Sequence, residues 1–100
     1  LYFWVREKKQ SSAEVDFVLP FDNRLVPIEV KSGKSGKMRA LQIYMDSCDH
    51  DFAVRLYAGS LTLHPATTLS GKTYRLLNLP YFLAGKLPEY LAWMNTQPLK

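Results

Sequence analysis

The side chains of this sequence whose types and spacing could do chemistry are two carboxylates and an amine, those of Asp16, Glu29 and Lys31. Carboxylate oxygens are ligands that Mg²⁺ prefers, usually one or two of them with water completing the octahedron. An ammonium group beside such an ion can orient a bound water or stabilise charge on an attacked phosphate. The three residues are therefore candidates for a magnesium site that could act on a phosphate, to which the carbonyl of Val30 could add a ligand.

The elements that must position these side chains are two strands joined by a tight turn. Residues 14–19 and 25–31 each alternate apolar and polar side chains with a period of two, which indicates strands. Pro20 is predicted to end the first strand, and Asp22 and Asn23 supply turn-forming residues. We therefore expect an antiparallel hairpin.

Such a hairpin would place the candidate ligands side by side. With a symmetric turn, Asp16 faces Glu29 and Glu14 faces Lys31, and facing residues have Cβ atoms about 4.5–5.5 Å apart. Facing like charges destabilise a sheet, and a divalent cation would offset their repulsion. The alternative is an ordinary solvent-exposed strand face on which Glu14 and Lys31 form an ion pair. A turn that is asymmetric by one residue would move the whole set to the other face.

The rest of the chain predicts a mixed α/β fold of the α+β type in one domain over residues 1–100. An apolar stripe with steps of three and four predicts a helix over residues 37–48. Further strands are predicted over residues 1–5, 52–58, 61–63 and 74–77, and short helices are predicted to begin at Pro80 and Pro88. Asp49-His50-Asp51 is expected in a loop, and His64 in a surface turn before Pro65.

The composition of the chain bears on its cellular location. No apolar run approaches the roughly 20 residues that span a bilayer, so no membrane association is expected. Cys48 is the only cysteine, which excludes an internal disulfide and favours a cytoplasmic location. The chain opens at Leu1 inside an apolar run, as expected for a fragment of a longer protein.

A formal net charge of +4 permits contact with nucleic acid. Lys34, Lys37 and Arg39 are candidate contacts to phosphates, and the alternative is a solvated loop that enters the helix. Gly33-Lys34-Ser35 is not a phosphate-binding loop, because Ile28 stands where the first glycine would be needed. No ATP site is therefore expected in this fragment.

The spacing of Asp16 from Glu29-Val30-Lys31 resembles the D…E-x-K signature of the PD-(D/E)xK, or restriction-endonuclease-like, nuclease fold. The sequence around these residues is similar to that of a C-terminal domain of unknown function attached to bacterial and archaeal AAA+-type ATPases. That similarity is carried by Tyr2-Phe3-Trp4, by Glu14-Val15-Asp16-Phe17-Val18, and by Pro27-Ile28-Glu29-Val30-Lys31-Ser32-Gly33.

The resemblance implies a mixed sheet flanked by helices, with the first core helix of that fold missing from this fragment. It implies that Asp16, Glu29 and the Val30 carbonyl hold Mg²⁺ and that Lys31 assists the attacking water. Glu14 and Gln42 are possible accessory residues. The implied partners are an upstream ATPase module of the same chain and DNA.

Two alternatives to a nuclease remain open. The same fold could be a catalytically inactive module that binds nucleic acid or protein and regulates the ATPase. The chain could also be a plain α/β domain in which the acidic pair is incidental.

Overall fold

The hairpin that was expected to carry the candidate ligands is present in the structure. The computed structural model describes residues 4–5, 15–31 and 39–97. In it, strand β2 (Phe17–Phe21) pairs antiparallel with β3 (Arg24–Val30). The two turn residues Asp22 and Asn23 have φ angles of 51° and 66°, as a type I′ turn requires. The register runs from Phe21–Arg24 to Phe17–Ile28, which confirms the symmetric turn.

Six strands form one mixed sheet, in the order β1-β2-β3-β4-β6-β5. The other strands are β1 (Trp4–Val5), β4 (Phe52–Tyr57), β5 (Thr62–Thr67) and β6 (Thr73–Pro80). Strands β3, β4 and β6 are parallel, whereas the pairs β1–β2, β2–β3 and β5–β6 are antiparallel. The mixed α/β class of the α+β type is confirmed.

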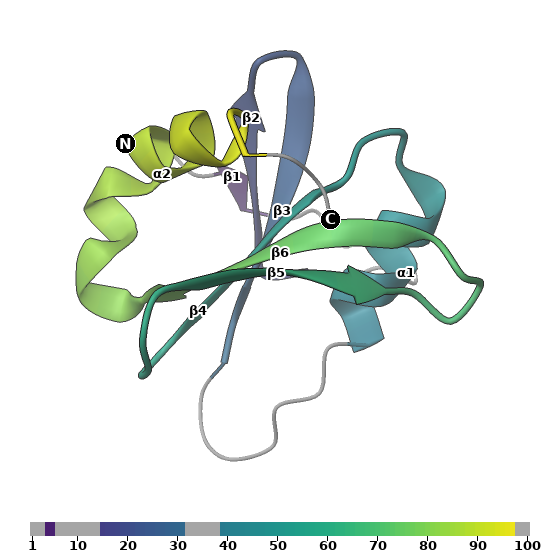
Figure 1. Ribbon diagram of the computed structural model, residues 1–100, viewed down its shortest axis with the longest axis horizontal. Helices are drawn as coiled ribbons and strands as arrows, with labels where there is room; N and C mark the ends of the chain where they lie inside the picture. The colour runs from purple at the N-terminus through teal and green to yellow at the C-terminus, as the bar shows by residue number, and fades with distance from the viewer. Residues whose placement is uncertain (1–3, 6–14, 32–38, 98–100) are drawn as a thin grey trace.

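Helices cover both faces of the sheet (Figure 1). Helix α1 (Arg39–Ser47) connects β3 to β4 and buries Leu41 and Met45 on one face, which we call the α1 face. The 3₁₀ helix η1 (Tyr81–Lys86) and helix α2 (Leu87–Met94) lie on the opposite face. No helix within residues 4–5, 15–31 and 39–97 is long and apolar enough to cross a membrane.

The central strand β4 is apolar on both sides because both of its faces are covered. Phe52, Ala53 and Val54 are consecutive and fully buried, as expected for a parallel strand between two helical layers. Phe52 and Val54 belong to the core under α2, whereas Ala53 belongs to the core under α1. The two small cores therefore meet at this strand.

Two proline-based predictions are wrong. Pro20 does not end its strand but pairs with Leu25 inside β2. Strand β1 pairs with β2 only at residues 17 and 18, so no neighbouring strand in the described residues needs a donor from Pro20. His64 is not in a turn but lies in β5 opposite Leu76, and Pro65 continues the same strand.

The predicted alternation of Val15, Phe17 and Leu19 on one face is also interrupted. Val15 is buried with α1, whereas Leu19 is buried in the core on the opposite face. The cause is a bend at Asp16, before β2 begins. The bend takes the backbone of Asp16 out of the regular ladder, so that its side chain can accept a hydrogen bond from β3.

The turn geometry makes a prediction about stability. Asn23→Ala is expected to lower the free energy of unfolding by about 1 kcal/mol, because alanine lacks the tolerance of asparagine for the left-handed region. Asn23→Gly is the matched control and should be at least as stable as the wild type. Urea denaturation measures both, and equal stability of the alanine variant would contradict the turn assignment.

Candidate metal centre

Asp16 lies at the end of the hairpin and binds the backbone of the opposite strand. Its Oδ2 accepts a hydrogen bond from the N–H of Val30 at 2.8 Å. The side chain thus occupies the place that a backbone carbonyl would take if the ladder continued beyond the Phe17–Ile28 pair. Asp16 itself is exposed to solvent, so an ion could reach its carboxylate.

Glu29 is the residue that this register places next to Asp16. Its Oε1 is buried and has no hydrogen-bond partner within the described ranges. The pKa of Glu29 is raised from 4.5 to about 7, mainly by burial and also by the negative charge of Asp16, while a backbone hydrogen bond from Asp16 acts in the opposite direction. The prediction that the two carboxylates lie together is confirmed.

The donor set of this pair fits a magnesium ion. Mg²⁺ is commonly held by one or two carboxylates and retains several waters, so the exposed Asp16 and the unsatisfied Glu29 oxygen suit it. Because the N–H and carbonyl of a strand residue point to the same neighbour, the Val30 carbonyl is also directed toward the Asp16 side. No group of three or more His, Cys, Asp or Glu side chains that could hold a metal occurs among the residues that the structure describes.

Lys31 follows at the end of β3. Its N–H donates to the carbonyl of Leu56 at 2.9 Å, and its own carbonyl accepts a hydrogen bond from the Tyr81 hydroxyl. Strand alternation from Glu29 to Lys31 puts both side chains on the α1 face. The amine is therefore attached one alternate position from the carboxylate, as the E-x-K spacing predicts.

The remaining predicted residues are only partly covered by the structure. Glu14, Lys34 and Lys37 lie outside the described residues. Arg39 is exposed at the first position of α1. Gln42 forms a side-chain hydrogen bond with Tyr74, which opposes the rise in the Tyr74 pKa that burial causes.

Sequence reasoning missed a line of polar residues that crosses the sheet beside Glu29. Glu29 on β3 is in register with Arg55 on β4, Arg55 with Asn78 on β6, and Asn78 with Thr62 on β5. We call these four residues the polar row. Since residues in register share a face, the polar row lies on the α1 face.

Hydrogen bonds connect the polar row from Arg55 outward. The Nε of Arg55 donates to Oδ1 of Asn78 at 2.8 Å, and Nδ2 of Asn78 donates to Oγ1 of Thr62 at 3.0 Å. Nδ2 also lies 3.0 Å from Nε2 of His64. Since Nδ2 can only donate, this contact requires an unprotonated Nε2, so Nδ1 carries the proton and donates to the carbonyl of Pro65 at 3.2 Å.

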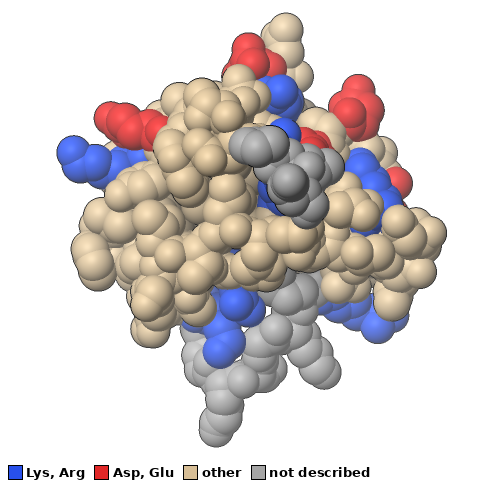
Figure 2. Space-filling model, viewed as in Figure 1, with Lys and Arg blue, Asp and Glu red and all other residues tan. Residues whose placement is uncertain are grey.

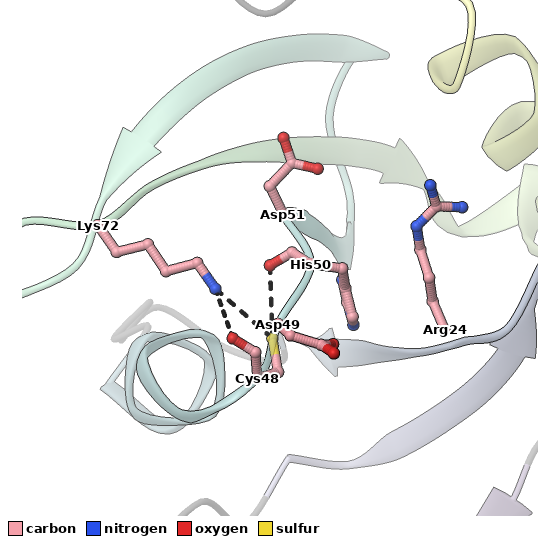
Figure 3. Close-up of a pocket in the computed structure, with 6 residues that line it drawn as sticks. All are labelled: Arg24, Cys48, Asp49, His50, Asp51 and Lys72. Atoms are coloured by element: carbon pink, nitrogen blue, oxygen red, sulfur yellow. Dashed lines mark hydrogen bonds between the residues drawn. The ribbon is translucent and has the colours of Figure 1, made fainter.

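A separate pocket is lined by Arg24, by residues 48–51 of the loop that follows α1, and by Lys72 (Figure 3). Lys72 donates to the carbonyls of Met45 and Cys48 at 2.8 and 2.7 Å, which satisfies the C-terminal end of α1. His50 accepts from the N–H of Phe52 at Nδ1 and donates from Nε2 to a carbonyl of β3. The side chains of Lys72 and His50 therefore stabilise the fold through these hydrogen bonds.

A family model described as "Domain of unknown function (DUF4143)" matches residues 1–81. No curated protein and no solved structure shows significant similarity to the chain.

Proposed function

The chain belongs to the DUF4143 family of domains of unknown function, and we propose that it is a metal-dependent phosphodiesterase of the PD-(D/E)xK type that acts on DNA. Asp16 and Glu29 would hold Mg²⁺ together with the Val30 carbonyl, and Lys31 would act beside the attacking water. The proposal also includes the AAA+-type ATPase module of the resemblance as the partner of this domain in the same polypeptide.

One observation carries the proposal. The Oε1 of Glu29 is buried without a hydrogen-bond partner in the described residues, next to a second carboxylate that is exposed. Leaving a buried acceptor unsatisfied costs about 1–3 kcal/mol, and two neighbouring carboxylates repel. A bound divalent cation would relieve both penalties, and this supports the proposal of a metal centre at this pair.

Each residue of the site has a separate role in hydrolysis. Hydrolysis forms a bond between a water oxygen and phosphorus, breaks the ester bond to the leaving oxygen, and transfers a proton from the water to that oxygen. A bound Mg²⁺ would supply Lewis acidity and lower the pKa of a coordinated water. The Lys31 ammonium would stabilise the negative charge that develops on the phosphoryl oxygens.

Charge on the molecular surface supports an anionic substrate. Strand β3 ends toward the lower edge of the molecule in Figure 1. In Figure 2, which has the same orientation, the charged side chains visible at this edge are those of Lys and Arg. A polyanion such as DNA would be attracted to this edge, next to the end of the strand that carries Glu29.

The proposal predicts that divalent ions stabilise the chain through Asp16. Adding Mg²⁺ or Mn²⁺ to metal-free protein should raise the melting temperature, because an ion at about 100 times its Kd stabilises the folded state by about 2.7 kcal/mol. Asp16→Asn should abolish the rise and should also remove metal-dependent cleavage of plasmid DNA. Thermal melting and gel electrophoresis measure the two effects.

A matched variant separates a specific site from general charge effects. Asp49→Asn also removes one exposed carboxylate, and it should retain both the rise and the cleavage. A melting temperature of the wild type that does not respond to either ion would refute the metal centre. An equal rise in Asp16→Asn would show that ions bind elsewhere.

A second candidate function is a non-catalytic docking module, and exposed aromatic residues favour it. Phe82 on η1 is 83% exposed and Trp93 on α2 is 42% exposed, although both elements otherwise pack on the sheet. Aromatic side chains contribute strongly to binding when a partner covers them, and tryptophan is enriched at interfaces. Cleavage that is absent in an otherwise metal-responsive wild type would favour this function.

A further inference from the structure

The end of strand β3 is bonded to a side chain on each of its two sides. On the β2 side, the N–H of Val30 donates to the carboxylate of Asp16 at 2.8 Å. On the β4 side, the N–H of Lys31 donates to the carbonyl of Leu56 at 2.9 Å. The carbonyl of Lys31 accepts a hydrogen bond from the hydroxyl of Tyr81. The backbone that carries the candidate amine is therefore held at both its N–H and its carbonyl.

The Tyr81 hydroxyl lies where the ladder between β3 and β4 would otherwise continue. A residue that bonds across a parallel ladder directs its N–H and its carbonyl toward the same neighbouring strand. The N–H of Lys31 bonds to β4, so its carbonyl faces β4 as well, but β4 ends at Tyr57. The donor that this carbonyl meets is a side chain. Tyr81 thus takes the place of a backbone donor at the point where β4 ends.

The packing of η1 explains why Tyr81 reaches this point. The last residue of β6 is in register with the last residue of β4, and η1 begins at the next position with Tyr81. Two further residues of η1, Leu83 and Ala84, pack on the same apolar core as Val30. A shared core therefore holds η1 against the end of β3.

The hydroxyl is the part of Tyr81 that a phenylalanine would lack. The residue is 42% exposed, so its ring contributes to packing only in part, and phenylalanine would fill the same space. The amine of Lys31 ends a flexible four-carbon stem. Its placement therefore depends on how firmly the backbone beneath it is fixed.

We propose that Tyr81 is a positioning residue for Lys31, and that its hydroxyl fixes the end of β3 from which the amine acts on a phosphoryl group. The inference rests on the proposed function for the role of the amine. It adds a residue that lies outside the D…E-x-K set and 50 positions further along the chain. Small errors in the placement of a reacting group are costly in rate, so a second contact that fixes its backbone contributes to catalysis.

Amide hydrogen exchange tests the contact without relying on hydrolysis. In Tyr81→Phe, the amide of Lys31 should exchange about threefold to tenfold faster than in the wild type, because one hydrogen bond at the strand end is lost. The amide of the fully buried Val54 in β4 should keep its rate, which shows that the fold is intact. Tyr57→Phe is the matched control, since the Tyr57 hydroxyl also donates to a backbone carbonyl, that of Ser60, and its loss should leave the exchange of Lys31 unchanged.

Steady-state cleavage of DNA with Mg²⁺ separates positioning from a structural role. Tyr81→Phe should lower kcat by about tenfold with little change in KM, as expected for loss of an interaction that matters in the transition state. Its rise in melting temperature with Mn²⁺ should equal that of the wild type, because Asp16 and Glu29 are intact. Tyr57→Phe should keep the kcat of the wild type.

The outcomes distinguish this inference from the proposed function. Faster exchange of Lys31 in Tyr81→Phe supports the positioning role, and an exchange rate equal to that of the wild type overturns it. In a chain that cleaves DNA, an unchanged kcat in Tyr81→Phe would also overturn it. A wild type that neither responds to metal nor cleaves DNA would reject the proposed function, and the exchange of Lys31 would still decide whether Tyr81 holds it.

Discussion

In metal-free buffer at about pH 8, the Glu29→Gln variant is expected to be more stable than the wild type by about 1–2 kcal/mol. Glutamine keeps the shape of the side chain but removes the charge that burial and Asp16 disfavour. The variant should also lose the rise in melting temperature that divalent ions cause. Gain of stability with loss of binding is typical of a residue retained for function.

The sign of this effect follows from the pKa of Glu29. The folded chain holds a proton on Glu29 up to about pH 7, whereas the unfolded chain releases it near 4.5. Between these values the folded state binds more protons, so the stability of the wild type falls as pH rises. Glutamine has no such proton, and the advantage of the variant should therefore grow across this window and stay constant above it.

Chemical denaturation of both proteins at several pH values measures the effect. Asp49→Asn serves as the control, because it removes an exposed carboxylate and should change stability little across the same range. A Glu29→Gln variant that is less stable than the wild type at about pH 8 without metal would contradict the buried, unsatisfied state of this carboxylate.

The second large effect is a steep dependence of metal affinity on pH. An ion must displace the proton from Glu29, so its apparent affinity should fall about tenfold for each pH unit below about 7. Between about pH 7 and about pH 5 the expected loss is of the order of a hundredfold. Above about pH 8 the Glu29 contribution should be constant.

Calorimetric titration with Mn²⁺ in buffers of different ionisation enthalpy measures both the affinity and the protons released. About one proton should leave per ion bound at about pH 6, and few should leave at about pH 8. In Glu29→Gln, any residual binding should lose this dependence. An affinity that is flat from about pH 6 to about pH 8 would show that Glu29 is not a ligand.

The hairpin that carries the site could be predicted from sequence because its determinants are local. Asp22 and Asn23 accept the positive φ angles of a two-residue turn, and that turn alone fixes every facing pair up to Phe17–Ile28. The bend at Asp16 could not be predicted, because it depends on the contact with Val30 and on burial of Val15 beneath α1.

The polar row was missed for a different reason. Arg55, Asn78 and Thr62 lie on three strands, and each looks like an isolated polar residue in its own segment. They are brought together only by the order β4-β6-β5, in which β6 lies between two strands that precede it in the sequence. The sequence predicts a turn at His64 because a residue before proline avoids helix and often ends an element, but His64 and Pro65 both lie within the outer strand β5.

Strand β5 is the last in the described sheet, and the position of Pro65 affects what that margin can do. Pro65 pairs with Arg75, whose N–H donates to the carbonyl of Asp51 on the far side from β5. Because this pair does not bond across the ladder, the nitrogen of Pro65 faces outward. The proline nitrogen carries no N–H to donate, so a strand of a second chain could not form a continuous set of hydrogen bonds with β5. Pro65 therefore disfavours edge-to-edge association of this protein along β5.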